Sequence, residues 1–537
     1  MADSWTFWAD EAADAVEARD PDEPIVIKGG ISPSGVPHLG NVNEIMRGHF
    51  VAAVLRERGH TVTQVFTTDD RDPLRALPRT LCDLEGRLVD LGDVDAAALG
   101  RNLGAPYTAI PDPFGCCNSY GDHFSQLIET SATALDVDIE LVSTTDLYVD
   151  GTLSPYIERL LRDREEARSV LSSYQEKVDD QYVPFNPICE NCGIVTETVT
   201  AVDETDAGVA ISYQCSDIEA GDRVIEGCGH EGVATPTSGK LPWRFEWPAQ
   251  WAALDVDFEP FGKDHAEGSW PSGVDIAETL LDSTPPVPLP YEWFTLEAEP
   301  FSSSSGHVVL VSEVLELVEP AVLRYFFAKD PGRARDFSIE RIDQLVDEFD
   351  RHEAVYFGEV DATPEEVARA ERIYPLVTDP RPERVRLPYR FAAVLGMSDD
   401  PAVRESIARR EGHIPENAPE WAVEAALERV ERATTWASRT DNEYAYELKR
   451  SEVPAHDFDE ETEAALAELA DVVAAGHDGE TIQGEIYEIA RRHDLEVSDF
   501  FAAGYRLFFD DTEGPRLGQF LAQLDREFVV DRLRRER

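Results

Sequence analysis

The N-terminal part of the chain alternates strand and helix patterns in the order that builds a parallel α/β sheet. Residues 25–31 (IVIKGGI) predict a short buried strand, and the turn-rich segment SPSGVPHLGN follows it directly. From Val42 onward apolar residues recur at helical spacing, and Asn41 is the N-cap that this pattern predicts. Residues 61–70 (TVTQVFTTDD) predict a second strand, which ends in carboxylates. Because ligands of such sheets bind beyond the carboxyl ends of the strands, we expect the functional site there.

The chain is too long for a single hydrophobic core. Its 537 residues predict several domains, and 42% apolar residues are enough to fill their cores. A cysteine-bearing stretch follows the opening α/β pattern, and strand-like, aromatic-rich segments return between Leu241 and about Asp336. After about residue 340 the pattern is helical nearly throughout, which predicts an all-α C-terminal domain.

The acidity of the chain indicates its habitat more than its partner. Against 107 Asp+Glu there are 48 Lys+Arg, of which six are lysines, giving a net charge of −59. Such acidity could repel nucleic acid or could keep the surface solvated in concentrated salt. The acidic residues are spread from end to end, which favours solvation. Molar salt shortens the Debye length to roughly 3 Å, so an RNA partner is not excluded.

The sequence predicts a soluble cytoplasmic protein without a membrane partner. The acidic N-terminus lacks the basic and apolar regions of a signal peptide. The sequence also has no apolar run of about 18 residues, the length that a membrane span requires.

Four of the seven cysteines form a set that could bind zinc. They are Cys189 and Cys192, separated by two residues, followed by Cys215 and Cys228. Four thiolates complete a tetrahedral zinc site, and clustered cysteines favour metal binding over disulfides in a reducing compartment. The gap between Cys215 and Cys228 is wide, so His230 could replace Cys228. A ribbon that has lost its metal is the alternative.

The segment between Gly30 and Asn41 carries residues suited to a nucleotide. Its glycines let the backbone approach a phosphate, and the N-terminus of the following helix favours negative charge. His38 could donate a hydrogen bond to the phosphate as charge builds in a transition state. Taken alone, the segment could also be an ordinary βα turn.

This segment, PSGxxHxGN, resembles the HIGH signature of class I aminoacyl-tRNA synthetases in the form found in class I lysyl-tRNA synthetases. The resemblance implies a Rossmann-type parallel sheet with an inserted zinc-binding module and an all-α C-terminal domain. It continues through VFTTDDRDPLRALP, IPDPFGC, LPWRFEWPAQWAALDVDFEPFGKDHAEGS, PPVPLPYEWF and FDRHEAVYFGE, which together cover most of residues 25–360. The implied domains are the first Rossmann half at 1–111, a connective insertion at 112–240, the second half at 241–299, a KMSKS-like loop and stem-contact segment at 300–345, and a helical anticodon-binding domain at 346–537.

The resemblance implies a two-step reaction performed by a monomer. ATP, with Mg²⁺, would activate L-lysine to lysyl-adenylate, and the lysyl group would then pass to the 3′ end of tRNA(Lys). His38 and Gly40 would hold ATP, with Asn41 in place of the second histidine of the general signature. Aromatic walls and carboxylates suit the stem and the ammonium of lysine. The lysine contacts expected are Gly30, Ser32, Trp243, His265 and Tyr291, which the family pattern implies, together with Asp72 and Asp264. Asp69, Asp70 and Asp72 could supply carboxylates to either substrate.

The second signature, KMSKS, is where the chain departs from the family. The family typically has KMSSSKG, whereas residues 300–306 read PFSSSSG and contain no lysine. Serines and a glycine suit a phosphate-binding loop, with Ser302, Ser303 and Ser304 as its catalytic candidates. We expect a potassium ion, ligated by the oxygens of these serines and Ser305, to replace the second lysine.

A second metal site is implied by the family pattern of Asp, Cys, His and His. The matching residues are Asp112, Cys116, Cys117 and His123, with Cys117 where the family has a histidine. Cysteine is an acceptable zinc ligand, so one or two zinc ions are expected. The remaining Cys82 is expected to be a small buried apolar residue.

Two rival interpretations stay open. A class I synthetase for another amino acid, such as glutamate, should carry an arginine in its pocket, whereas the residues implied here are aromatic and acidic. A catalytically weakened, synthetase-like RNA-binding protein is favoured by the lysine-free loop alone.

Candidates for stacking on unpaired anticodon bases are Arg439, Tyr444, Tyr446 and Arg450.

Overall fold

The computed structural model describes residues 5–176, 178–205, 208–221, 223–301, 307–398, 400–446, 448–449, 454–522 and 524–535. The chain forms two compact units. The first comprises Met1–Val314, Pro320–Ser338 and Gly358–Asp379, and the second comprises Leu315–Glu319, Ile339–Phe357 and Pro380–Arg537.

A five-stranded sheet forms the centre of the first unit, and every pair of neighbouring strands in it is parallel. The predicted parallel α/β sheet is therefore confirmed. Both predicted N-terminal strands are present, and they pair from Ile25 opposite Val62 to Ile31 opposite Thr68. In sheet order the strands are β14 (Val287–Tyr291), β13 (Phe258–Gly262), β1 (Ile25–Ile31), β2 (Val62–Thr68) and β5 (Glu140–Ser143).

Helix α2 (Leu39–Glu57) follows β1 and packs its apolar side on the sheet. Its N-cap is His38, so the prediction of Asn41 as N-cap was wrong. The His38 ring accepts a hydrogen bond from the Gly40 N–H, and the Asn41 side chain accepts one from the His38 N–H. This reciprocal capping box starts the helix before the apolar periodicity begins at Val42, which is why the pattern placed the start too late.

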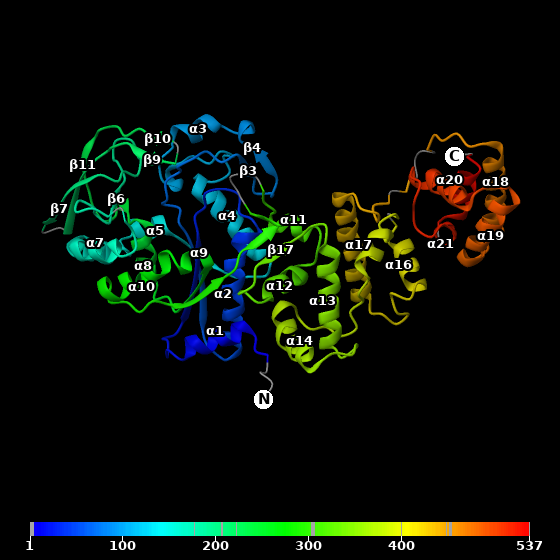
Figure 1. The fold of residues 1–537 in the computed structure, drawn as a ribbon, viewed down its shortest axis with the longest axis horizontal. Helices are drawn as coiled ribbons and strands as arrows, with labels where there is room; N and C mark the ends of the chain where they lie inside the picture. Colours follow the sequence, from blue (N-terminus) through cyan, green and yellow to red (C-terminus); the bar gives the residue numbers. More distant parts are fainter. Residues whose placement is uncertain are drawn as a thin grey trace. The chain divides into compact units, whose positions relative to one another are not determined.

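Helix α8 (Trp243–Ala253) replaces the strand-like structure expected from Leu241 onward. Trp243, Trp247 and Trp251 follow one another at intervals of four residues, so their rings lie next to one another along one side of the helix. Pro248 lies inside the helix and obscures its pattern in the sequence. The helix packs beside α10 (Ser269–Leu280) (Figure 1).

The first unit contains further helices, short strands and 3₁₀ turns outside the central sheet and the cysteine-bearing stretch (Figure 1). They are α1 (Trp8–Glu17), β3 (Thr80–Cys82), β4 (Leu88–Asp90), α3 (Ala96–Arg101), α4 (Tyr120–Thr133), α5 (Thr144–Val149), α6 (Ser154–Arg162), α7 (Arg164–Ser172), α9 (Lys263–Ala266), β15 (Phe294–Leu296), β16 (Glu299–Pro300), α12 (Pro320–Ala328), β17 (Arg335–Phe337) and α14 (Pro364–Val377), with the 3₁₀ turns Leu91–Asp93 and Tyr107–Ala109. Helix α11 (Val311–Leu315) spans a boundary between the units.

The cysteine-bearing stretch forms three small antiparallel sheets. Their core includes Ile211 and Tyr213 of the central strand, packed with Cys189 and Cys215. The sheets are β11–β8–β7, β10–β9 and β12–β6, with β6 (Asn186–Pro187), β7 (Val199–Thr205), β8 (Gly208–Gln214), β9 (Ile218–Ala220), β10 (Arg223–Ile225), β11 (Glu231–Ala234) and β12 (Gly239–Lys240).

The second unit contains helices and no strand among its described residues, which confirms the predicted helical C-terminal region. The fully buried Arg429 links two separate segments of this unit, because its guanidinium lies 2.7 Å from Glu319 and 2.6 Å from Asp350. No helix in the described part of the whole chain has the length and apolar character that crossing a bilayer requires. The helices of this unit are α13 (Ile342–Tyr356), α15 (Tyr389–Leu395), α16 (Pro401–Arg410), α17 (Glu420–Thr440), α18 (Glu460–Ala474), α19 (Gly479–Arg492), α20 (Val497–Phe509), α21 (Leu517–Leu521) and α22 (Arg526–Leu533).

Candidate active site

A cavity of about 320 Å³ opens at the carboxyl ends of β1, β2 and β13, the edge where the sequence predicted the functional site. It brings together five of the seven predicted lysine contacts and adds acidic and aromatic residues that the sequence did not single out. Its lining consists of Lys28, Gly30, Ile31, Ser32, Glu44, Asp69, Asp72, Trp243, Trp247, Glu259, Phe261 and His265.

Glu44 is the acidic residue that sequence reasoning missed. It projects from α2 into the cavity, and its carboxylate accepts hydrogen bonds from the Gly30 N–H (2.7 Å) and the Tyr291 hydroxyl (3.0 Å). Burial raises the pKa of Glu44 to about 7. Tyr291, a predicted substrate contact, therefore lies behind Glu44 rather than on the cavity wall. A glutamate inside a helix gives no sequence signal that separates it from a solvated surface residue.

A buried ion pair forms the floor beside β1 and β13. Lys28 Nζ lies 2.7 Å from Glu259 Oε1, and both side chains are almost fully buried. Glu259 also accepts hydrogen bonds from the indole N–H groups of Trp247 (2.9 Å) and Trp251. The charge of Lys28 is thus matched within the protein.

A second buried lysine, Lys240, pairs with the carboxylate of Asp72 at the other side of the cavity. Lys240 makes ion pairs with Asp72 and, at 3.0 Å, with Glu246. Burial, together with the nearby carboxylates of Glu246 and Asp72, raises the pKa of Asp69. Asp70 points away from the cavity and accepts a hydrogen bond from the Thr145 N–H at 2.8 Å. Of the three aspartates after β2, Asp69 and Asp72 face the site and Asp70 is structural.

The conformation of His38 fixes which ring nitrogen faces outward. Its Nδ1 accepts a hydrogen bond from the Gly40 N–H at 3.1 Å, and burial lowers the pKa of His38 to about 4. The ring is therefore neutral at physiological pH, and Nε2 carries the proton. A β-carbon on Gly40 would lie 3.0 Å from two atoms of this ring, so any larger residue there would press on the His38 ring. The predicted catalytic residues Ser302, Ser303 and Ser304 lie outside the described residues.

The GKDH segment contributes one side chain to the cavity. His265, at the end of α9, lines it, and its Nδ1 lies 3.0 Å from the Ser269 hydroxyl. Asp264 does not line the cavity; it accepts a hydrogen bond from the Trp293 indole at 3.4 Å.

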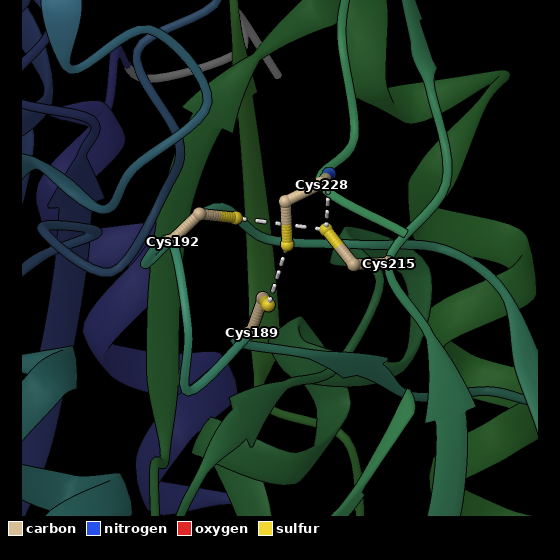
Figure 2. A group of neighbouring side chains, drawn as sticks. All are labelled: Cys189, Cys192, Cys215 and Cys228. Atoms are coloured by element: carbon tan, nitrogen blue, oxygen red, sulfur yellow. Dashed lines mark hydrogen bonds between the residues drawn. The ribbon is translucent and has the colours of Figure 1, made fainter. Parts of the chain in front are cut away.

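Cys189, Cys192, Cys215 and Cys228 form one cluster, as Figure 2 shows. Their sulfur atoms lie within 4.8 Å of one another, with 3.6 Å separating Cys189 from Cys228 and Cys192 from Cys215. A disulfide requires about 2.05 Å, whereas sulfurs at the corners of a tetrahedron around zinc are about 3.8 Å apart. The spacing therefore fits zinc.

Two tight turns position these cysteines in the cluster. Gly193 (φ 79°) bonds back to the Cys189 carbonyl at 2.8 Å, and Gly229 (φ 73°) bonds back to the Cys215 carbonyl at 3.0 Å. Left-handed backbone of this kind favours glycine. His230, the alternative fourth ligand, instead lies 2.8 Å from Glu190, so the fourth corner belongs to Cys228.

Asp112, Cys116, Cys117 and His123 form the second cluster, with ligand atoms also within 4.8 Å. The His123 Nε2 lies 2.8 Å from the Cys82 carbonyl, which assigns the ring proton to that nitrogen. Its Nδ1, 3.3 Å from the Cys116 sulfur, is then free to bind a metal. The chemistry and spacing of this set also fit zinc. Cys82 itself is buried, as predicted.

Comparison with known proteins gives the family. A model of the tRNA synthetases class I (K) matches residues 6–379. The chain is 66% identical to a lysine–tRNA ligase of Haloarcula marismortui and 67% identical to one of Halobacterium salinarum, each match covering 99% of this chain and 97% of the relative. It is also 30% identical to a lysine–tRNA ligase of Pyrococcus furiosus, over 98% of this chain and 99% of that one. The chain therefore belongs to the class I (K) family of tRNA synthetases.

Proposed function

We propose that the protein is a lysine–tRNA ligase, which activates L-lysine with ATP and transfers it to tRNA(Lys). The observation that carries this proposal is the cavity at the carboxyl ends of β1 and β2, whose aromatic walls suit an alkyl stem and whose carboxylates suit ammonium groups. A glutamate pocket needs a cation for the substrate carboxylate, but no arginine is among the described residues that line this cavity, and Lys28 is already paired with Glu259. The relatives named lysine–tRNA ligase support the same substrate.

We assign the two ammonium groups of lysine to the two supported carboxylates. Glu44, backed by Tyr291, and Asp72, backed by Lys240, accept hydrogen bonds from them. Trp243 and its stacked neighbour Trp247, 5.2 Å away between ring centroids, cover the alkyl stem. The backbone at Gly30 and Ser32 and the ring of His265 complete the enclosure.

The reaction needs no covalent bond to the enzyme. A carboxylate oxygen of lysine attacks the α-phosphorus of ATP, and pyrophosphate leaves. A hydroxyl of the terminal tRNA ribose then attacks the carbonyl carbon of lysyl-adenylate, and AMP leaves. The protein contributes the positioning of both substrates and fixed hydrogen-bond donors for the charge that develops on phosphate.

His38 is the donor that the fold holds ready for the phosphates. Its outward Nε2–H and the N-terminus of α2 both favour the negative charge of ATP, which enters with Mg²⁺ as its counter-ion. Gly40 and Asn41 act by holding the His38 ring and backbone. The oxygens of Ser302–Ser305, which lie outside the described residues, would hold a potassium ion, because a hard cation prefers oxygen ligands, and that ion would supply the charge that lysine gives in the family signature.

Zinc at the cysteine cluster has a structural role in this proposal. The four thiolates close the coordination sphere, so no position is open for a substrate. Zinc ligation there holds the two turns of the inserted module together. The Asp112, Cys116, Cys117 and His123 set holds a second ion beside α4.

The helical unit is proposed to bind the anticodon in the cytoplasm of a cell with high internal salt. Tyr444 is a base-stacking candidate, although its ring already stacks on Trp436 with centroids 6.1 Å apart. Arg439 and Tyr446 are further candidates. Arg450 lies outside the described residues.

Amino-acid-dependent ATP–pyrophosphate exchange tests the proposal directly. We expect exchange with lysine alone when all twenty amino acids are compared in molar KCl, and lysylation of tRNA(Lys) under the same conditions. Exchange with glutamate instead would favour the first rival interpretation. A folded protein that binds tRNA without exchange with any amino acid would favour the second.

A further inference from the structure

Phe301 lies directly against the catalytic histidine candidate. It follows β16 and precedes the serine-rich segment, and its ring stacks on the ring of His38 with centroids 5.0 Å apart and planes inclined by 10°. The family signature typically places methionine in this loop after its first lysine, whereas here Pro300 and Phe301 precede the serines. The departure from the signature therefore puts an aromatic ring against His38.

The stack completes a set of restraints on the His38 ring. Rotation of an imidazole about its χ2 angle is broad and roughly two-fold, so one hydrogen bond leaves the ring plane loosely defined. The Gly40 N–H selects which nitrogen faces inward, and Phe301 fixes the plane in which the ring lies. A β-carbon on Gly40 would lie 3.0 Å from the His38 ring and 3.5 Å from the Phe301 ring, so Gly40 lies against both rings of the stack.

The chain after the serine-rich segment is attached to the same helix start. The Leu39 N–H donates to the Val309 carbonyl at 2.9 Å. On the preceding side, Phe301 contacts His38, the neighbour of Leu39. Both flanks of residues 302–306 are thus anchored at the first residues of α2, where the phosphates of ATP are proposed to bind.

We propose that Phe301 is a positioning residue for ATP activation, because it holds the His38 ring in the plane that directs Nε2–H at the phosphates. This inference rests on the proposed function. An aromatic pair contributes about 0.5–1.5 kcal/mol beyond its buried area, which corresponds to a rate effect of roughly two- to tenfold if the orientation matters in the transition state alone.

The test measures lysine-dependent ATP–pyrophosphate exchange in molar KCl with the full-length protein. Phe301→Ala should lower kcat by roughly two- to tenfold and leave the KM for lysine unchanged. Phe301→Tyr keeps an aromatic ring and should retain the rate. Phe301→Leu keeps apolar volume without a flat ring and should behave like Phe301→Ala. As a matched control, Phe391→Ala removes a phenylalanine that packs on His413 in the helical unit, with centroids 4.3 Å apart, and should leave exchange unchanged.

A double-mutant cycle with His38→Ala separates positioning from a general structural effect. If Phe301 acts through His38, Phe301→Ala should have no further effect once His38 is alanine. An equal loss in both backgrounds, or a Phe301→Ala enzyme as fast as the wild type, would overturn the inference. A wild-type protein without lysine-dependent exchange would instead overturn the proposed function.

Discussion

The hydroxyl of Tyr291 donates a 3.0 Å hydrogen bond to Oε2 of Glu44, and the other oxygen of that carboxylate accepts from the backbone of Gly30. The bond joins the end of β14 to α2. It fixes a carboxylate in the cavity wall in one orientation.

Glu44→Gln should weaken lysine binding. A hydrogen bond to a charged group contributes about 1.5–3 kcal/mol, so the KM for lysine should rise by roughly ten- to a hundredfold. The KM for ATP should change little, because Glu44 faces the cavity and not the start of α2. Steady-state exchange with each substrate varied in turn measures both effects, and an unaltered lysine KM would remove Glu44 from the site.

The pH dependence of lysine binding should follow the same carboxyl group. Burial and the neighbouring Glu259 raise the pKa of Glu44 to about 7, against the opposing effects of the Gly30 N–H, Lys28 and Tyr291. Below that pH the free enzyme carries a proton that lysine must displace, so affinity should fall about tenfold from pH 8 to pH 6. Glu44→Gln should abolish this contribution, which binding measurements at constant ionic strength can detect.

His38→Ala should lower the rate of exchange by roughly a hundredfold or more. The side chain supplies a hydrogen-bond donor to developing charge on the α-phosphate, and loss of such a donor typically costs about that much. Lysine binding should be little affected. A variant that exchanges at the wild-type rate would contradict the assignment of the segment between Gly30 and Asn41.

Metal analysis of the purified protein should find two zinc ions per chain. Cys228→Ser should remove one of them, and His123→Ala the other, because each is a ligand of a separate cluster. Chelation should unfold the inserted module while the helical unit persists. One ion, retained in His123→Ala, would restrict zinc to the four cysteines, and no ion at all would contradict both sites.

Exchange should be faster in KCl than in NaCl at equal ionic strength if potassium serves the serine loop. Ser305→Lys should relax that preference by supplying a fixed charge. Folding must be compared in the two salts by circular dichroism, since bulk salt also screens the repulsion of a chain with net charge −59. Equal rates with equal folding would rule the ion out.

The sequence predicted what local pattern and signature residues encode. The strands β1 and β2, the helical C-terminal region and the grouping of Cys189, Cys192, Cys215 and Cys228 follow from patterns in the sequence, whereas the grouping of Asp112, Cys116, Cys117 and His123 was implied by the family resemblance. Prediction from the sequence failed at two positions where a single residue departs from the general pattern. The N-cap of α2 is His38 rather than Asn41, because the His38 ring accepts the capping hydrogen bond. The helical spacing of Trp243 and Trp247 was obscured by Pro248, which lies inside α8.

The acidic members of the site were the hardest to foresee. Glu44 and Glu259 lie on different elements and acquire their importance only when β1, β13 and α2 converge. Nothing in their immediate neighbours distinguishes them from the other acidic residues of so acidic a chain. The ion pairs of the two lysines at the site, Lys28 and Lys240, were equally hard to predict, because Glu259 and Asp72 are distant from them in sequence.

Glu44, Asp69, Asp72 and Glu259 line the cavity and Glu246 lies beside it, whereas the ion pairs formed by these carboxylates are with two internal lysines, Lys28 and Lys240. Burial raises the pKa of Glu44 to about 7 and that of Asp69 to about 8, so protons on these two groups balance part of the excess charge of the free enzyme. A substrate with two ammonium groups would balance the same negative charge, so the carboxyl groups could then release these protons. Lysine binding is then an exchange of cations, in which protons leave as the amino acid enters, and the buffer should register their release.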